Sequence, residues 1–108
     1  MSQDTLLALA AVVRQRRNAT GDTSYTRKLL DGGVKTCGKK LAEEAAETIM
    51  AAVSESDEAL KAEAADLLYH LIVLLEVREV SLSDVIGVLE GRMGRSGVDE
   101  KAARGGSR

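Results

Sequence analysis

Two pairs of carboxylates with three-residue spacing are the side chains most able to do chemistry in this sequence. Glu44 and Glu47 form the first pair, and Glu63 and Asp66 form the second. Residues three apart lie about 60° apart around a helix axis, so each pair would point to one side of its helix. If the chain turns back between the pairs, they reach similar heights on neighbouring antiparallel helices.

Four carboxylates that face one another repel and therefore need a compensating charge. Mg²⁺ is a hard cation that takes oxygen ligands and partners phosphates, and Mn²⁺ is an alternative. An ion held by Glu44, Glu47, Glu63 and Asp66 would neutralise charge on a phosphate leaving group and acidify a water. Glu43 stands beside the first pair and could orient or deprotonate that water.

The same spacing is also compatible with an ordinary solvated helix face. Lys39 and Lys40 precede Glu43 and Glu44 by four residues, an arrangement typical of surface ion pairs on a helix. Periodicity alone therefore leaves the metal site and the acidic surface open as interpretations.

Three further residues have both a functional and a structural interpretation. Lys40 could contact a phosphate or pair with Glu44, one turn later. His70 follows Asp66 by one turn, and a buried histidine bonded to Asp66 is favoured over a general base. Tyr25 could stack on a purine or fill the core.

Helical periodicity and punctuation predict the elements that must position these residues. We expect helices over residues 5–17, 34–54, 57–78 and 82–93, with a short helical segment over 24–30 and a break at Asp31-Gly32-Gly33. Ser56 and Asp57 both offer capping side chains for the helix over 57–78, and Ser81 is expected to cap the helix over 82–93. The fold class is all-α, an antiparallel bundle of four main helices over residues 1–93. Residues 94–108 form a basic, Gly-rich tail, expected either to close over the substrate or to be solvated.

The apolar pattern predicts which faces are buried. The run Leu67–Leu75 is apolar nearly all round apart from His70, so its helix is expected at the centre of the bundle. The apolar set predicted to face the core from the helix over 34–54 is Val34, Cys37, Leu41, Ala45, Ile49, Met50 and Val53.

Composition limits the kinds of protein this can be. The chain has 108 residues, two Tyr and no Phe or Trp, so its core is thin and aliphatic, and we expect a homodimer. A net charge of −2 argues against binding a nucleic acid polymer. One Cys and one His exclude an intramolecular disulfide and a Cys/His zinc site. No signal segment is apparent and runs such as Leu71–Leu75 are too short for a membrane, so a cytoplasmic location is expected.

Four segments together resemble a known enzyme family. The segments at 38–47 and 63–71 carry the ExxE and ExxD signature of the all-α nucleotide pyrophosphatases, which include MazG-like enzymes. Ser24-Tyr25-Thr26 and the tail segment Ser-Gly-x-x-Glu-Lys-Ala-x-Arg over 96–104 are similar to its phosphoribosyl-ATP pyrophosphatase branch. Members of that branch act in histidine biosynthesis.

The resemblance implies a function and a set of roles. It implies Mg²⁺-dependent hydrolysis of the α–β phosphoanhydride of phosphoribosyl-ATP, giving phosphoribosyl-AMP and pyrophosphate, with the four carboxylates as ligands. Lys40, Lys101 and Arg104 are then candidates for phosphate contacts, and the subunits of a dimer would meet near the site. The alternatives are a MazG-like housekeeping hydrolase of nucleoside triphosphates and a non-enzymatic helical dimerisation module.

Overall fold

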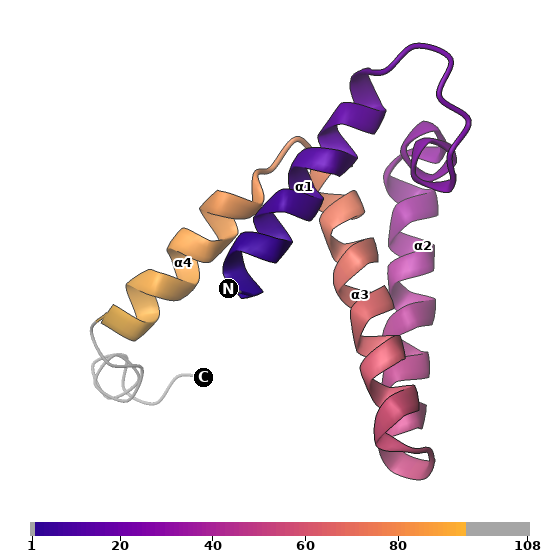
Figure 1. Cartoon of the computed structure of the whole chain (residues 1–108), viewed down its shortest axis with the longest axis vertical. Coiled ribbons are helices and arrows are strands. Elements are labelled where there is room, and N and C mark those ends of the chain that lie inside the picture. Colours follow the sequence, from indigo (N-terminus) through magenta and orange to yellow (C-terminus); the bar gives the residue numbers. More distant parts are fainter. Residues whose placement is uncertain (1, 95–108) are drawn as a thin grey trace.

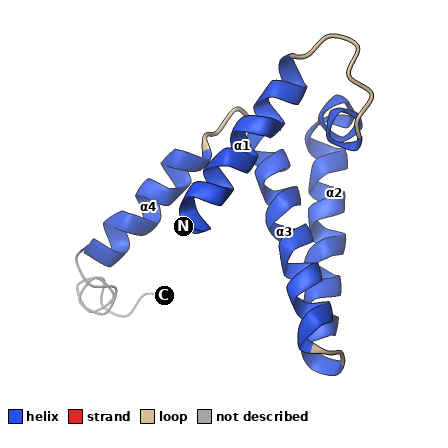
Figure 2. Ribbon diagram, in the orientation of Figure 1, coloured by secondary structure: helices blue, strands red, loops and turns tan. Residues whose placement is uncertain are grey.

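The computed structural model describes residues 2–94, which form four helices joined by short connections (Figure 1). Side chains are described from residue 5 onward. Between residues 2 and 94 there is no strand, which confirms the all-α prediction (Figure 2). The helices are α1 (Ser2–Asn18), α2 (Tyr25–Ser54), α3 (Asp57–Val77) and α4 (Leu82–Gly94). Within the described residues, none of these helices has the length and apolarity required to cross a membrane.

Serine side chains begin three of the helices. Each serine oxygen accepts a hydrogen bond from a backbone N–H that has no partner within its own helix. The pairs are Ser24 with Arg27 (3.1 Å), Ser56 with Ala59 (3.1 Å) and Ser81 with Asp84 (3.0 Å). Of the two candidates for the cap of α3, Ser56 caps the helix and Asp57 is its first residue, while the predicted cap at Ser81 is confirmed.

Gly33 divides α2 into two parts. Its φ of 82° and ψ of −173° lie in a region that only glycine adopts readily. A Cβ on the preceding Gly32 would lie 2.7 Å from Cβ of Thr36, so that position also requires glycine. The predicted break is confirmed, and the axis of the first turns of α2 makes a steep angle with the axis of the rest of the helix (Figure 1).

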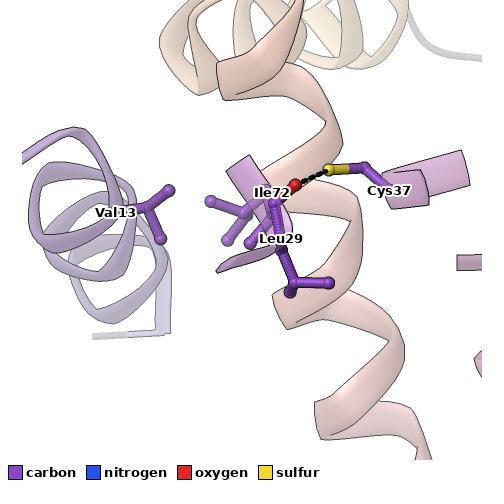
Figure 3. Packing of buried hydrophobic residues seen from close by; sticks show 5 residues of the cluster. Val13, Leu29, Cys37 and Ile72 are labelled. Atoms are coloured by element: carbon purple, nitrogen blue, oxygen red, sulfur yellow. Dashed lines mark hydrogen bonds between the residues drawn. The ribbon is translucent and has the colours of Figure 1, made fainter. Parts of the chain in front are cut away.

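The core lies where α1, α2 and α3 meet. Its buried apolar residues are Val13, Leu29, Cys37, Ile72 and Val73. Figure 3 shows Val13 of α1 facing Ile72 and Leu29, while the Cys37 thiol donates to the Leu29 carbonyl at 3.2 Å. The helix α3 packs against both α1 and α2, as predicted for a central helix, although Leu68 within the run predicted to be central is exposed.

Part of the predicted core is exposed. Val34, Ile49, Met50 and Val53 were expected inside, but Val53 is 80% exposed and the other three side chains are also exposed. The bundle is also more open than expected, because α4 packs mainly on α1 and lies apart from the long hairpin of α2 and α3 (Figure 1). The apolar stripe on the second half of α2 is therefore left without a cover from the described chain.

Two ion pairs to a buried carboxylate link α1 to the end of α3. Glu76 is only 6% exposed, and its carboxylate contacts Arg14 and Arg17 from α1. Burying a carboxylate without such partners would cost several kcal/mol. The contacts of Glu76 with the two arginines therefore fix how α1 lies on the hairpin of α2 and α3.

Candidate metal centre

Three of the four predicted ligands converge between α2 and α3. One carboxylate oxygen from each of Glu44, Glu63 and Asp66 lies within 4.8 Å of the others. Glu44 stands on α2, while Glu63 and Asp66 stand on α3, so the antiparallel hairpin brings them together. This convergence is what the paired spacing predicted, while metal binding itself stays a prediction.

Glu47 lies beside this cluster without belonging to its tightest group. Burial raises the pKa of Glu63 above its ordinary value, and a hydrogen bond with Glu47 raises it further. The negative charges of Glu47, Glu44 and Asp66 act in the same direction. The acidic side chains are thus close enough to repel one another, as four facing carboxylates should.

Two carboxylate oxygens in the cluster have no hydrogen-bond partner among the described residues. They are Oε1 of Glu44 and Oε1 of Glu63, and both are buried. A buried polar atom without a partner costs free energy, and the cost is larger for a charged group. The all-oxygen donor set and these two unpartnered atoms fit a hard divalent cation such as Mg²⁺.

Lys40 stands at the edge of the cluster and pairs with Glu43. Its Nζ lies 3.4 Å from Oε1 of Glu43, three residues later in the chain. The structural interpretation of Lys40 had predicted a pair with Glu44 instead. The hydrogen bond to Glu43 raises the pKa of Lys40, and the negative charges of Glu43 and Glu44 raise it further. The ammonium group therefore lies within electrostatic reach of Glu44, a member of the carboxylate cluster.

His70 connects Tyr25 to the turn of α3 that carries Asp66. Its Nδ1 donates to the backbone carbonyl of Asp66 at 2.8 Å, which agrees with the favoured interpretation of a buried histidine bonded to Asp66. In the neutral ring, Nε2 then accepts a hydrogen bond from the hydroxyl of Tyr25 at 3.1 Å. Both ring nitrogens are occupied by these contacts.

The ring of Tyr25 belongs to a small aromatic cluster. It stacks on Tyr69 with ring centroids 6.3 Å apart and makes a T-shaped contact with the ring of His70 at 6.0 Å. The hydroxyl of Tyr69 in turn bonds to the hydroxyl of Thr26. Tyr25 nevertheless remains 50% exposed, so it does not simply fill the core.

Two threonines whose hydroxyls bond near the site were not singled out from the sequence. Thr48 donates to the backbone of both helices, and Thr26 bonds to Tyr69. The only signal for Thr48 was its place one turn after Glu44 on the same helix face. The predicted phosphate contacts Lys101 and Arg104 lie outside the described residues.

Sequence comparison with known proteins identifies the family of this chain. Residues 6–93 match the sequence profile of the family described as phosphoribosyl-ATP pyrophosphohydrolase. A phosphoribosyl-ATP pyrophosphatase from Nitrobacter winogradskyi is 51% identical over 104 residues, covering 96% of this chain and 90% of the relative. Similar proteins of the same name from Erythrobacter litoralis and Agrobacterium fabrum are 49% and 47% identical, covering 94% and 96% of this chain and 98% and 97% of the relatives. With its carboxylate cluster and these matches over nearly its whole length, the chain belongs to the phosphoribosyl-ATP pyrophosphohydrolase family.

Proposed function

We propose that the chain hydrolyses phosphoribosyl-ATP to phosphoribosyl-AMP and pyrophosphate in histidine biosynthesis, at a divalent-metal site between α2 and α3. Family membership supports the substrate and the reaction. The observation that carries the site is the convergence of Glu44, Glu63 and Asp66, with two buried oxygens that have no other partner.

The four acidic side chains would hold Mg²⁺, or Mn²⁺ in its place. Glu44, Glu63 and Asp66 offer oxygens to a shared point, and Glu47 stands beside Glu63 to complete the set. When bound, the ion supplies charge neutralisation at the phosphates and acidifies a water. The carboxylates contribute a fixed, oxygen-rich pocket that favours such an ion over softer metals.

Lys40 and Glu43 form an ion pair that a phosphate group of the substrate can break. A phosphate oxygen competes with Glu43 for the Lys40 ammonium group, which lies 3.4 Å from the Glu43 carboxylate. Once released from Lys40, the Glu43 carboxylate is free to accept a proton from the attacking water. In this account Lys40 binds the substrate, and Glu43 orients and deprotonates the water.

Tyr25 is assigned to substrate binding. Its ring is half-exposed, and its position is fixed by the hydroxyl bond to His70 and by stacking on Tyr69. A fixed aromatic ring with exposed surface is suited to stacking on a purine. Residues 1–93 are assigned to the catalytic domain, and Lys101 and Arg104, which lie outside the described residues, are assigned to phosphate binding.

A second copy of the chain would cover the exposed apolar stripe of α2. Ile49, Met50 and Val53 lie on the second half of α2, as do Glu44 and Glu47. An exposed apolar patch of this kind typically marks an interface. A homodimer formed there would place its interface close to the metal centre, and a cytoplasmic location suits the proposed pathway.

A pyrophosphate-release assay tests the proposal. Wild type should hydrolyse phosphoribosyl-ATP faster than plain nucleoside triphosphates, which separates it from a MazG-like housekeeping hydrolase. A chelator, or Glu47→Ala, should nearly abolish turnover while leaving the fold intact. Glu58→Ala is the matched control, because Glu58 is an exposed acid of α3 that contacts Lys61. Full turnover in Glu47→Ala, or metal-independent turnover, would contradict the proposal.

A further inference from the structure

Thr48 ties the backbones of two proposed metal ligands to each other. It is half-buried on α2, one turn after Glu44. Its Oγ1 lies 2.8 Å from the backbone carbonyl oxygen of Glu44 and 3.2 Å from that of Glu63. Both carbonyls only accept, so the single hydroxyl hydrogen is shared between a carbonyl of α2 and a carbonyl of α3.

The contact to the second helix is what distinguishes Thr48 from an ordinary helical hydroxyl. A Ser or Thr hydroxyl commonly donates to the carbonyl four residues earlier in its own helix. Ser54, also on α2, makes that bond alone, because its Oγ donates to the Met50 carbonyl at 3.2 Å. Ser54 therefore provides a comparison in which the local bond is present and the hydroxyl makes no hydrogen bond to α3 among the described residues.

The two carbonyls that accept from Thr48 belong to Glu44 and Glu63, whose carboxylates both lie in the proposed metal site. Glu44 and Glu63 each carry a buried oxygen without a hydrogen-bond partner, and their negative charges repel. Repulsion favours separation or sliding of the two helices at this level. A hydroxyl shared between their backbones opposes that movement, since it fixes both the spacing and the register of α2 on α3.

We propose that Thr48 is a positioning residue that holds Glu44 and Glu63 in the register at which their carboxylates share one divalent cation. This inference rests on the proposed function, because it presumes that the cluster binds a metal. Residues that support metal ligands without touching the ion typically contribute 10- to 100-fold to affinity.

Titration of the metal-free, full-length protein with Mn²⁺ tests the role, with free Mn²⁺ measured by electron paramagnetic resonance. Thr48→Val keeps the shape and removes the hydroxyl, and we expect its Mn²⁺ affinity to fall about tenfold. Thr48→Ser restores the hydroxyl and should return the affinity close to wild type. Ser54→Ala loses only the local bond and should bind Mn²⁺ as wild type does.

Thermal unfolding without metal separates positioning from general stabilisation. The melting temperature of metal-free Thr48→Val should stay close to that of wild type. If Thr48→Val does not fold, Thr48→Ala removes the same hydroxyl with the best helix former in its place. Unchanged Mn²⁺ affinity in the folded hydroxyl-free variant would overturn the inference. Equal losses in Thr48→Ser or Ser54→Ala would overturn it as well.

Glu63→Gln distinguishes failure of this inference from failure of the proposed function. If wild type binds Mn²⁺ and Glu63→Gln does not, the metal site is supported. In that case, a wild-type affinity in Thr48→Val contradicts only the role of Thr48. If wild type and Glu63→Gln both fail to bind Mn²⁺, the metal site and the inference fall together.

Discussion

The hydroxyl of Tyr25 lies 3.1 Å from Nε2 of His70, and this contact joins the kinked start of α2 to the centre of α3. The other ring nitrogen of His70 donates to the carbonyl of Asp66, a proposed metal ligand. Tyr25, which is proposed to stack on the purine, and the metal centre are thus linked through one imidazole. The kink at Gly33 gives the first turns of α2 the direction from which Tyr25 reaches α3.

Removing the Tyr25 hydroxyl should weaken substrate binding more than it slows the reaction. Tyr25→Phe keeps the ring and loses the bond to His70, so we expect KM for phosphoribosyl-ATP to rise roughly 3- to 10-fold, the range of one hydrogen bond, with kcat nearly unchanged. His70→Leu should have a similar effect on KM. Steady-state kinetics of each variant gives both constants.

The double variant of Tyr25 and His70 checks that the two residues act through one contact. If they do, Tyr25→Phe combined with His70→Leu should be no worse than the more damaging single change. Strictly additive losses, or a fall in kcat at constant KM, would mean that the contact does not position the ring for substrate.

Neutralising Glu63 should stabilise the metal-free protein. The pKa of Glu63 is raised in the folded chain, chiefly by burial, so its ionisation costs folding free energy. In wild type this cost is absent well below the ordinary value of 4.5 and grows as pH rises through the folded pKa. Glu63→Gln should therefore melt higher than wild type at pH 7 in chelator, with the difference shrinking toward pH 4.

Added Mn²⁺ should reverse that order. Metal that binds only the folded state raises the melting temperature of wild type, whereas Glu63→Gln lacks a ligand and should barely respond. A metal-free Glu63→Gln protein that is less stable than wild type at pH 7 would contradict the repulsion inferred for the cluster.

Gly33→Ala should destabilise the fold and disturb Tyr25. A side chain at φ 82° and ψ −173° costs about 1–3 kcal/mol, because these angles are accessible essentially to glycine alone. The matched control is Gly38→Ala, since Gly38 lies in regular helix with open space around it and should gain about 0.5–1 kcal/mol. Denaturant unfolding measures both, and a neutral Gly33→Ala would show that the kink is not required.

Removing Arg17 should cost more stability than removing Glu76. Arg17→Met leaves the buried Glu76 carboxylate with Arg14 as its remaining ionic partner, and we expect a loss of about 2–3 kcal/mol. Glu76→Met leaves two arginines that already reach solvent, so its loss should be smaller. Chemical denaturation of both variants gives the comparison, and the opposite order would argue against a buried charge as the cause.

The sequence predicted those features that depend on helix geometry alone. The spacing of Glu44, Glu63 and Asp66 predicted their convergence, because a period of 3.6 residues fixes the face and a short turn fixes the height. Serine caps and the diglycine break were also visible, since each depends on one or two residues. Lys40 could not be assigned a partner, because Glu43 and Glu44 are both its neighbours on a helix surface.

Features that depend on how helices pack were not predictable. Periodicity shows that Ile49, Met50 and Val53 form an apolar stripe, but not whether the chain itself covers it. Thr48 is compatible with either a buried or a solvated helix position, so its contact with α3 follows only from the register of the hairpin. The contact between Tyr25 and His70 spans 45 residues and depends on the direction of the kink at Gly33.

A crystal structure of the full chain with Mn²⁺, measured at the manganese absorption edge, tests the metal centre most directly. The account predicts an anomalous difference peak between α2 and α3, within bonding distance of carboxylate oxygens from Glu44, Glu63 and Asp66. A peak elsewhere, or these carboxylates pairing with lysines or arginines instead of the ion in every subunit, would contradict it.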